Sequence, residues 1–197
     1  MTATRVSLVV LGSSTRVLST LCAECPFHAA GCCHAPPAYD LADVARVVQA
    51  AGGLDFLLHA IASGTIVAED GVHPRALKLA THKRRIVQGT VPKGRALACS
   101  QLSDAGCTLD PSYRPATCNY YVCAEGLRDE HAPEDPARPY AVLREWWTRI
   151  NGAFDAAFPS LPENWSTDRG LLLALAAFLD DYERRAGLAR TDAQNSV

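Results

Sequence analysis

Eight cysteines in two groups are the residues of this chain best suited to chemistry. The first group consists of Cys22, Cys25, Cys32 and Cys33, and the second of Cys99, Cys107, Cys118 and Cys123. The Cys-x2-Cys turn of the first group places two thiolates on one side of a tight loop, which suits a tetrahedral metal ion or an iron–sulfur cluster. Soft sulfur ligands select zinc, iron–sulfur iron or copper(I) over magnesium or calcium. The pattern therefore predicts a thiolate site whose cofactor is zinc or iron, the latter as an ion or an iron–sulfur cluster.

The alternative interpretation is that the cysteines are buried apolar residues or disulfides. The apolar run over residues 6–11 is too short for a signal peptide, and Arg16 follows soon after it. The later apolar run over 170–179 is about half the length that a membrane span needs. We therefore expect a cytoplasmic protein with no membrane segment. In that reducing compartment eight cysteines favour metal binding over disulfides.

Neither cysteine group forms a good site alone. Six residues separate Cys25 from Cys32, and the adjacent Cys32 and Cys33 rarely both reach one tetrahedral ion without strain. The second group contains no Cys-x2-Cys turn. We therefore predict that at least one centre takes ligands from both groups, so that the metal closes a loop of roughly sixty-five residues. His28 and His34, inside the first group, are alternative ligands because imidazole binds both zinc and iron.

The sequence around both groups resembles a known family. The first group reads Cys22-Ala23-Glu24-Cys25 followed by Cys32-Cys33, and the second contains Cys99-Ser100-Gln101-Leu102, Cys107 and Arg114-Pro115-Ala116-Thr117-Cys118-Asn119-Tyr120-Tyr121-Val122-Cys123. Over about residues 20–125 this pattern resembles the YkgJ-like CxxCxxCC family. The resemblance implies chelation of zinc or iron by the eight cysteines. Arg114 would then donate hydrogen bonds to a sulfur atom or a backbone carbonyl beside the site, or would only stabilise a turn.

Two other classes of function stay open. Flagellin lysine N-methylases share a similar cysteine cluster, so the resemblance also admits an iron–sulfur-dependent modifying enzyme. Alternatively, the metal stabilises a platform that binds a protein partner through Trp146, Trp147 or the acidic segment 124–139. A brown protein that bleaches on reduction would favour a cluster, whereas a colourless zinc protein would favour a chelating or structural module.

Composition describes a globular protein of ordinary size. Of the 197 residues 48% are apolar and 20% charged, which is enough to form a core. The net charge of −2 argues against non-specific binding to nucleic acid, which a basic surface usually mediates. We expect a small α+β fold, with a cysteine-cluster metal-binding domain over 1–124. A C-terminal helical pair over 138–187 packs on that domain, and a flexible tail covers 188–197.

Local patterns place the elements that position the cysteines. Asp40 is a candidate N-cap for a helix that Gly52-Gly53 ends, and a second helix is expected over 54–62. We expect strands over 4–11 and 65–68, a hairpin that pairs 84–87 with 95–98, and an irregular loop over 20–38. Two closing helices follow, separated by Pro159 and Pro162. Their expected apolar faces are Tyr140, Leu143, Trp147, Ile150, Phe154 and Ala157 in the first, and Leu171, Leu175, Phe178, Leu179 and Tyr182 in the second.

Overall fold

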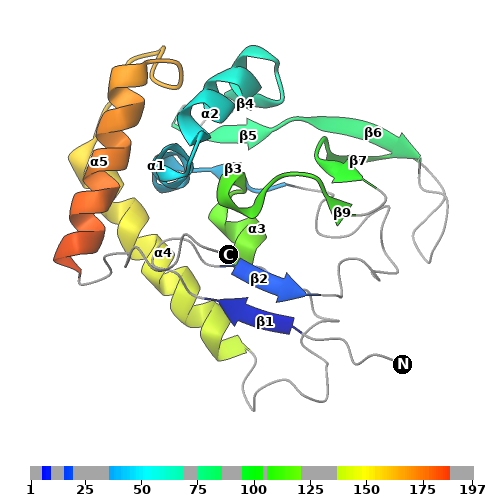
Figure 1. The fold of residues 1–197 in the computed structure, drawn as a ribbon, viewed down its shortest axis with the longest axis horizontal. Coiled ribbons are helices and arrows are strands. Elements are labelled where there is room, and N and C mark those ends of the chain that lie inside the picture. The colour runs from blue at the N-terminus through cyan, green and yellow to red at the C-terminus, as the bar shows by residue number, and fades with distance from the viewer. Residues whose placement is uncertain are drawn as a thin grey trace.

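The computed structural model describes residues 6–9, 16–19, 36–68, 75–85, 95–103, 106–120 and 137–186. Helices and short antiparallel strands are mixed in these ranges, which confirms an α+β fold (Figure 1). The strands are β1 (Val6–Val9), β2 (Arg16–Ser19), β3 (Ala38–Tyr39), β4 (Ile66–Ala68), β5 (Leu77–Leu79), β6 (Thr81–Arg85), β7 (Arg95–Cys99), β8 (Leu102–Ser103) and β9 (Gly106–Cys107). The helices are α1 (Leu41–Gln49), α2 (Gly53–Ala62), α3 (Ala116–Tyr120), α4 (Ala137–Ala157) and α5 (Arg169–Arg185).

Four small sheets carry the strands. β1 pairs with β2, β6 with β7 and β8 with β9, while β5 lies between β3 and β4. In the β6–β7 pair Thr81 faces Cys99 and Arg85 faces Arg95, so the predicted hairpin is confirmed with its strands somewhat displaced. Pairing of β3 with β5 and of β1 with β2 was not predicted, because strands of two to four residues leave little pattern to detect.

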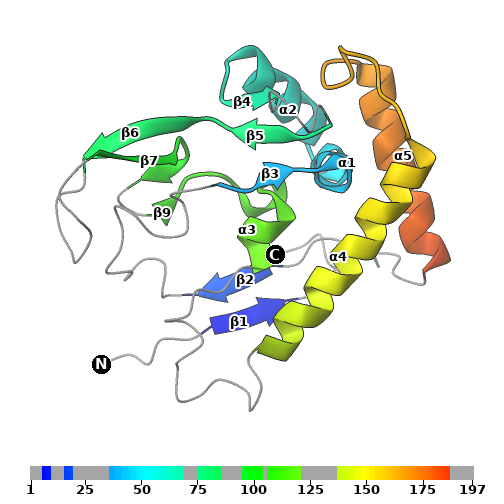
Figure 2. The same cartoon turned by 180° about the vertical axis from the view of Figure 1, so that it is seen from behind.

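Helix α1 is the centre of the fold. Asp40 begins it as predicted, with a carboxylate oxygen that accepts a hydrogen bond from the Asp43 backbone N–H at 2.8 Å. Every residue from Leu41 to Val48 is buried, because α1 lies between the β3–β5–β4 sheet and the C-terminal helices (Figure 2). A helix that is covered on all sides must also bury its polar side chains.

The two glycines after α1 begin the next helix rather than simply ending the first. α1 ends at Gln49, and Gly52 precedes α2 with a φ of 71°, in the left-handed region that glycine adopts without strain. A Cβ atom on Gly53 would lie 1.7 Å from the Val47 carbonyl oxygen. Only glycine therefore lets α2 start so close to the backbone of α1.

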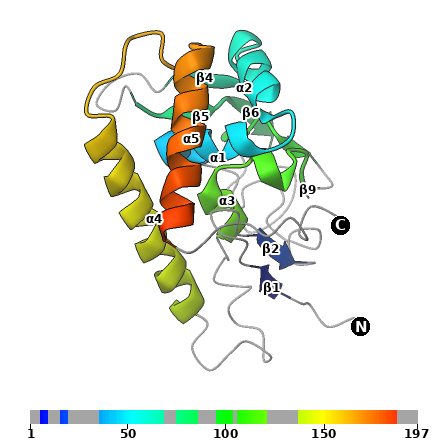
Figure 3. The same ribbon diagram turned by 60° about the vertical axis from the view of Figure 1, so that its left-hand side comes forward.

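Helices α4 and α5 pack on α1, with α4 and α5 side by side in Figure 3. Trp147, Ile150 and Phe154 are buried as predicted, whereas Ala157 is exposed because it closes the helix beyond the core. The buried residues of α5 are Leu172, Leu175, Ala176, Leu179 and Glu183, and the predicted Leu171, Phe178 and Tyr182 are partly buried beside them. The apolar stripe of α5 is thus centred slightly to one side of the predicted one.

Several predictions fall outside the described residues. They concern the loop around the first cysteine group, the acidic segment up to residue 136, the tail over 188–197 and the side chains of Tyr140 and Leu143. The division into domains 1–124 and 138–187 also stays a prediction. Among the described helices none has both the length and the apolar content that crossing a bilayer requires.

Candidate functional site

Three of the eight predicted ligands lie in the described part of the chain. Cys99 ends β7, Cys107 lies in β9, and Cys118 lies in the middle of α3. All three are thiols rather than disulfides. Cys99 is buried, Cys118 is partly buried and Cys107 is exposed. Cys22, Cys25, Cys32, Cys33 and Cys123, together with His28 and His34, lie outside the described residues.

Cys118 and Cys99 both influence the buried Tyr39 hydroxyl, and Cys107 influences Cys99. Burial raises the pKa of the Tyr39 hydroxyl, and the charges of Asp43 and Cys118 and, to a smaller extent, Cys99 raise it further. Burial likewise raises the pKa of the Cys99 thiol, and the charge of Cys107 adds to the rise. These electrostatic couplings place Cys99 near both Cys107 and the Tyr39 hydroxyl, which is itself near Cys118.

β2 and β3 lie on the two sides of segment 20–35 in the sequence. β2 ends at Ser19, three residues before Cys22, and contacts α3, the helix that carries Cys118. Figures 1 and 3 show α3 directly beside β2. On the other side of the segment, Pro36 follows Cys33 by three residues and leads into β3, which carries Tyr39. The described residues on the two sides of segment 20–35 therefore lie on β2, against α3, and on β3, which carries Tyr39.

The described residues do not by themselves complete a metal site. In ranges 36–68, 75–85, 95–103, 106–120 and 137–186, no three cysteine, histidine or carboxylate side chains lie close enough to hold one ion. Cys99, Cys107 and Cys118 supply soft donors, and the remaining predicted ligands lie elsewhere in the chain. A cation at this position would supply the positive charge that a buried Cys99 thiolate requires.

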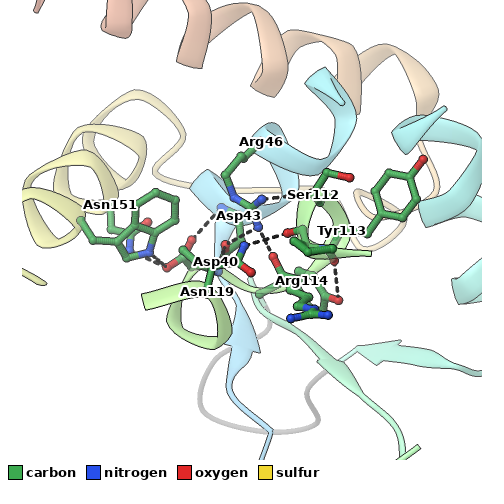
Figure 4. A network of polar contacts seen from close by, with 12 residues as sticks. Asp40, Asp43, Arg46, Ser112, Tyr113, Arg114, Asn119 and Asn151 are labelled. Atoms are coloured by element: carbon green, nitrogen blue, oxygen red, sulfur yellow. Dashed lines mark hydrogen bonds and ion pairs between the residues drawn. The ribbon is translucent and has the colours of Figure 1, made fainter. Parts of the chain in front are cut away.

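Two charged side chains of α1 hold the backbone that precedes Cys118 (Figure 4). The Arg46 guanidinium donates to the carbonyl oxygen of Ser112 at 3.0 Å and to that of Arg114. The Asp43 carboxylate accepts from the Ala116 backbone N–H at 2.6 Å and from Arg46 at 3.3 Å. We call Asp43 and Arg46 the α1 clamp; both are almost fully buried.

Further hydrogen bonds fix the rest of this segment. The Tyr39 hydroxyl donates to the Tyr113 carbonyl at 2.9 Å, and the Asn119 amide donates to the Pro111 carbonyl at 2.7 Å. The Tyr113 ring stacks on Phe56 with centroids 4.3 Å apart. Arg114 Nε donates to the Leu109 carbonyl at 2.8 Å, which is the backbone role considered for this arginine.

Asp40 connects the same helix to α4. Its second carboxylate oxygen accepts from Trp147 Nε1 at 3.1 Å and from the Asn151 amide (Figure 4). Trp147 is therefore committed to an internal contact, and Trp146 is partly buried against it with ring centroids 6.0 Å apart. Trp147 is thus unavailable to a protein partner, whereas Trp146 stays partly exposed and the interaction-module hypothesis stays a prediction.

The two carboxyls of this network share one guanidinium. Burial raises the pKa of Asp43 to about 8, and the neighbouring Asp40 charge adds to the rise while Arg46 opposes it. Burial also raises the pKa of Asp40, against the opposing effect of its three hydrogen bonds. When both carboxyls are ionised, Asp40, Asp43 and Arg46 together carry a net charge of about −1. Uptake of one proton by a carboxyl neutralises this charge.

We expect stability to fall as pH rises. The pKa of Asp43 is about 8 in the folded chain, against its usual 3.8. The folded state therefore binds more protons than the unfolded state between these values, and the free energy of unfolding decreases as pH rises from about 4 to about 8. Urea unfolding at several pH values measures the slope. The Asp43→Asn variant should show a shallower slope, and an equal slope in both proteins contradicts the assignment.

The α1 clamp was not anticipated, although the sequence contains a signal for it. Asp40, Asp43 and Arg46 follow at intervals of three along a helix whose other residues are mostly apolar. Such a helix is covered on most sides, so these charges must meet partners inside the protein. The partners themselves leave no signal, because several are backbone carbonyls.

The chain matches no protein-family model, no curated protein and no solved structure at a significant level.

Proposed function

We propose that this chain binds zinc or iron through cysteine thiolates drawn from both groups. The observation that carries the proposal is that Cys118 lies on a helix packed against β2, which leads into the first group, while Cys118 and Cys99 both influence Tyr39 on β3, which follows that group. The resemblance of the spacing to the YkgJ-like family points to the same chemistry. When bound, the metal supplies a cation that deprotonates its thiol ligands and joins segments distant in the sequence.

The positions of the described cysteines support sharing between the groups. Cys99 and Cys118 approach the Tyr39 hydroxyl from a strand and a helix that are separated by the β8–β9 hairpin. The residues that lead into and out of the first group lie on β2 and β3, against α3 and Tyr39. Only a few residues separate β2 from Cys22 and β3 from Cys33, so a centre with ligands from both groups requires little additional chain length.

Metal content of untagged protein tests this function. We expect at least about one zinc or iron per chain by elemental analysis, as four-thiolate sites bind tightly. Cys118→Ala should lower that content and make the chain near Ala29-Ala30 more susceptible to proteolysis. Thr148→Ala, at an exposed position on α4, is the control and should change neither. Wild-type protein with less than about half an equivalent of metal would contradict the function.

The absorption spectrum then identifies the centre. Anaerobically purified protein that absorbs near about 400 nm and bleaches with dithionite contains an iron–sulfur cluster. A colourless protein with stoichiometric zinc has a zinc–thiolate site. A peptide covering residues 20–38 that binds the metal as tightly as the full chain would contradict sharing between the groups.

A further inference from the structure

We propose that Asp43 and Arg46 are positioning residues for Cys118, and through it for the thiolate site. The proposal rests on the proposed function where it concerns metal affinity. It rests on geometry alone where it concerns Cys118. Neither side chain is a metal ligand in this account; both act on the backbone that leads into α3.

The α1 clamp holds three backbone groups along the segment that runs from the 3₁₀ helix Pro111–Tyr113 into α3. Its contacts are the carbonyls of Ser112 and Arg114 and the N–H of Ala116, each two residues after the last. Two side chains of one helix thus satisfy three backbone groups of this segment. The last gripped residue, Ala116, begins α3, and Cys118 lies two residues further on. The clamp therefore sets where α3 starts and how its first turn is directed.

Hydrogen bonds from outside α1 also hold the segment that leads to Cys118. Tyr39 holds the Tyr113 carbonyl between the two carbonyls that Arg46 holds. Asn119, adjacent to Cys118, closes the segment on itself through the Pro111 carbonyl. Backbone groups of five residues between Pro111 and Ala116 thus have fixed partners, which restricts Cys118 to one place.

A contribution to stability does not by itself explain why Asp43 and Arg46 are buried here. A buried ion pair seldom stabilises a protein more than apolar residues of similar volume, since both charges lose their hydration. Here the Nε atom of Arg46 is also buried with no hydrogen-bond partner among the described residues, which adds to the cost. Unlike apolar residues, this ion pair makes directional hydrogen bonds to specific backbone atoms.

A matched pair of Arg→Lys variants tests the proposal. Arg46→Lys keeps the charge but replaces a planar fork with a single ammonium, which cannot span both carbonyls and the carboxylate. Arg149→Lys changes an exposed ion pair on α4, with Glu145 at 3.0 Å, and is the control. Circular dichroism establishes folding. Zn²⁺ affinity is measured by competition with a chromophoric chelator, and alkylation of each cysteine in metal-free protein is followed by mass spectrometry.

For Arg46→Lys we expect Zn²⁺ affinity to fall about 10–100-fold, as for other residues that orient ligands. Cys118 should also be alkylated several-fold faster, while the exposed Cys107 reacts as in the wild type. Asp43→Asn, which keeps an acceptor oxygen for the Ala116 N–H, should act in the same direction and serves if Arg46→Lys does not fold. Unchanged affinity and unchanged Cys118 alkylation in a folded variant overturn the proposal. A wild-type chain that binds no metal overturns the proposed function instead, and the Cys118 rates still decide the positioning role.

Discussion

Arg46→Met is expected to destabilise the fold by about 3–5 kcal/mol at about pH 10, above the folded pKa of Asp43, because it leaves a buried carboxylate without its counter-charge. The Asp43 carboxylate then has only the Ala116 N–H to oppose the loss of hydration, and the carbonyls of Ser112 and Arg114 lose their donor. The loss should be smaller at about pH 6, below the raised pKa of about 8, because Asp43 is then already protonated in the folded protein. Chemical denaturation at the two pH values measures both effects.

Two further variants separate charge from volume in this experiment. Asp43→Asn combined with Arg46→Met removes both charges while the amide oxygen still accepts from Ala116, so it should recover much of the lost stability. Arg149→Met removes an exposed pair and should change stability by less than about 1 kcal/mol. If the double variant is as unstable as Arg46→Met, the cost lies in the missing contacts with the backbone rather than in the unpaired charge.

Phe154→Ala is expected to destabilise the protein by about 3–5 kcal/mol, because it opens a cavity where α4 meets α5. Phe154 is 1% exposed, and its ring meets Phe178 edge to face with centroids 4.8 Å apart. Phe158 contacts the same two rings. The loss should lower the midpoint of a single cooperative unfolding transition, followed by tryptophan fluorescence and by circular dichroism.

Leu173→Ala is the matched control for that variant. Leu173 also lies on the helix pair but is 53% exposed, so its replacement should change stability by less than about 0.5 kcal/mol. Two separate transitions, of which only one responds to Phe154→Ala, would show that α4 and α5 unfold independently of the cysteine-bearing segments. Coincident transitions would show one cooperative unit.

Periodicity and capping were enough to predict α1, α2, α4 and α5, but not the five-residue helix α3. Asp40 marks the start of α1, and the spacing of Trp147, Ile150 and Phe154 defines the buried side of α4. The β6–β7 hairpin was also predictable, since a turn sequence separates its strands. The sheet around β5 was not, because its strands contain two or three residues and pair across long stretches of sequence.

The sequence predicts candidate ligands, which stay a prediction, but it did not reveal the side chains that support the segment before Cys118. Cysteine spacing identifies soft donors whatever the fold, because thiolates have few other reasons to cluster. The α1 clamp acts on the carbonyls of Ser112 and Arg114, and every residue type carries such a group. No pattern of side chains can therefore show which backbone atoms Arg46 will meet.

The central position of α1 also has a consequence for synthesis of the chain. Apart from β3, the elements that pack on α1 in the described part of the chain are synthesised after it. Arg46 donates to the Ser112 carbonyl, and Gln49 donates to the Ala176 carbonyl at 3.1 Å. At about 5–20 residues per second the ribosome needs roughly ten seconds to reach α5. During that interval a helix destined for burial on all sides is exposed to water. Burial removes the hydration of Asp43 and Arg46 only when these partners pack on α1, so in the nascent chain both charges stay hydrated.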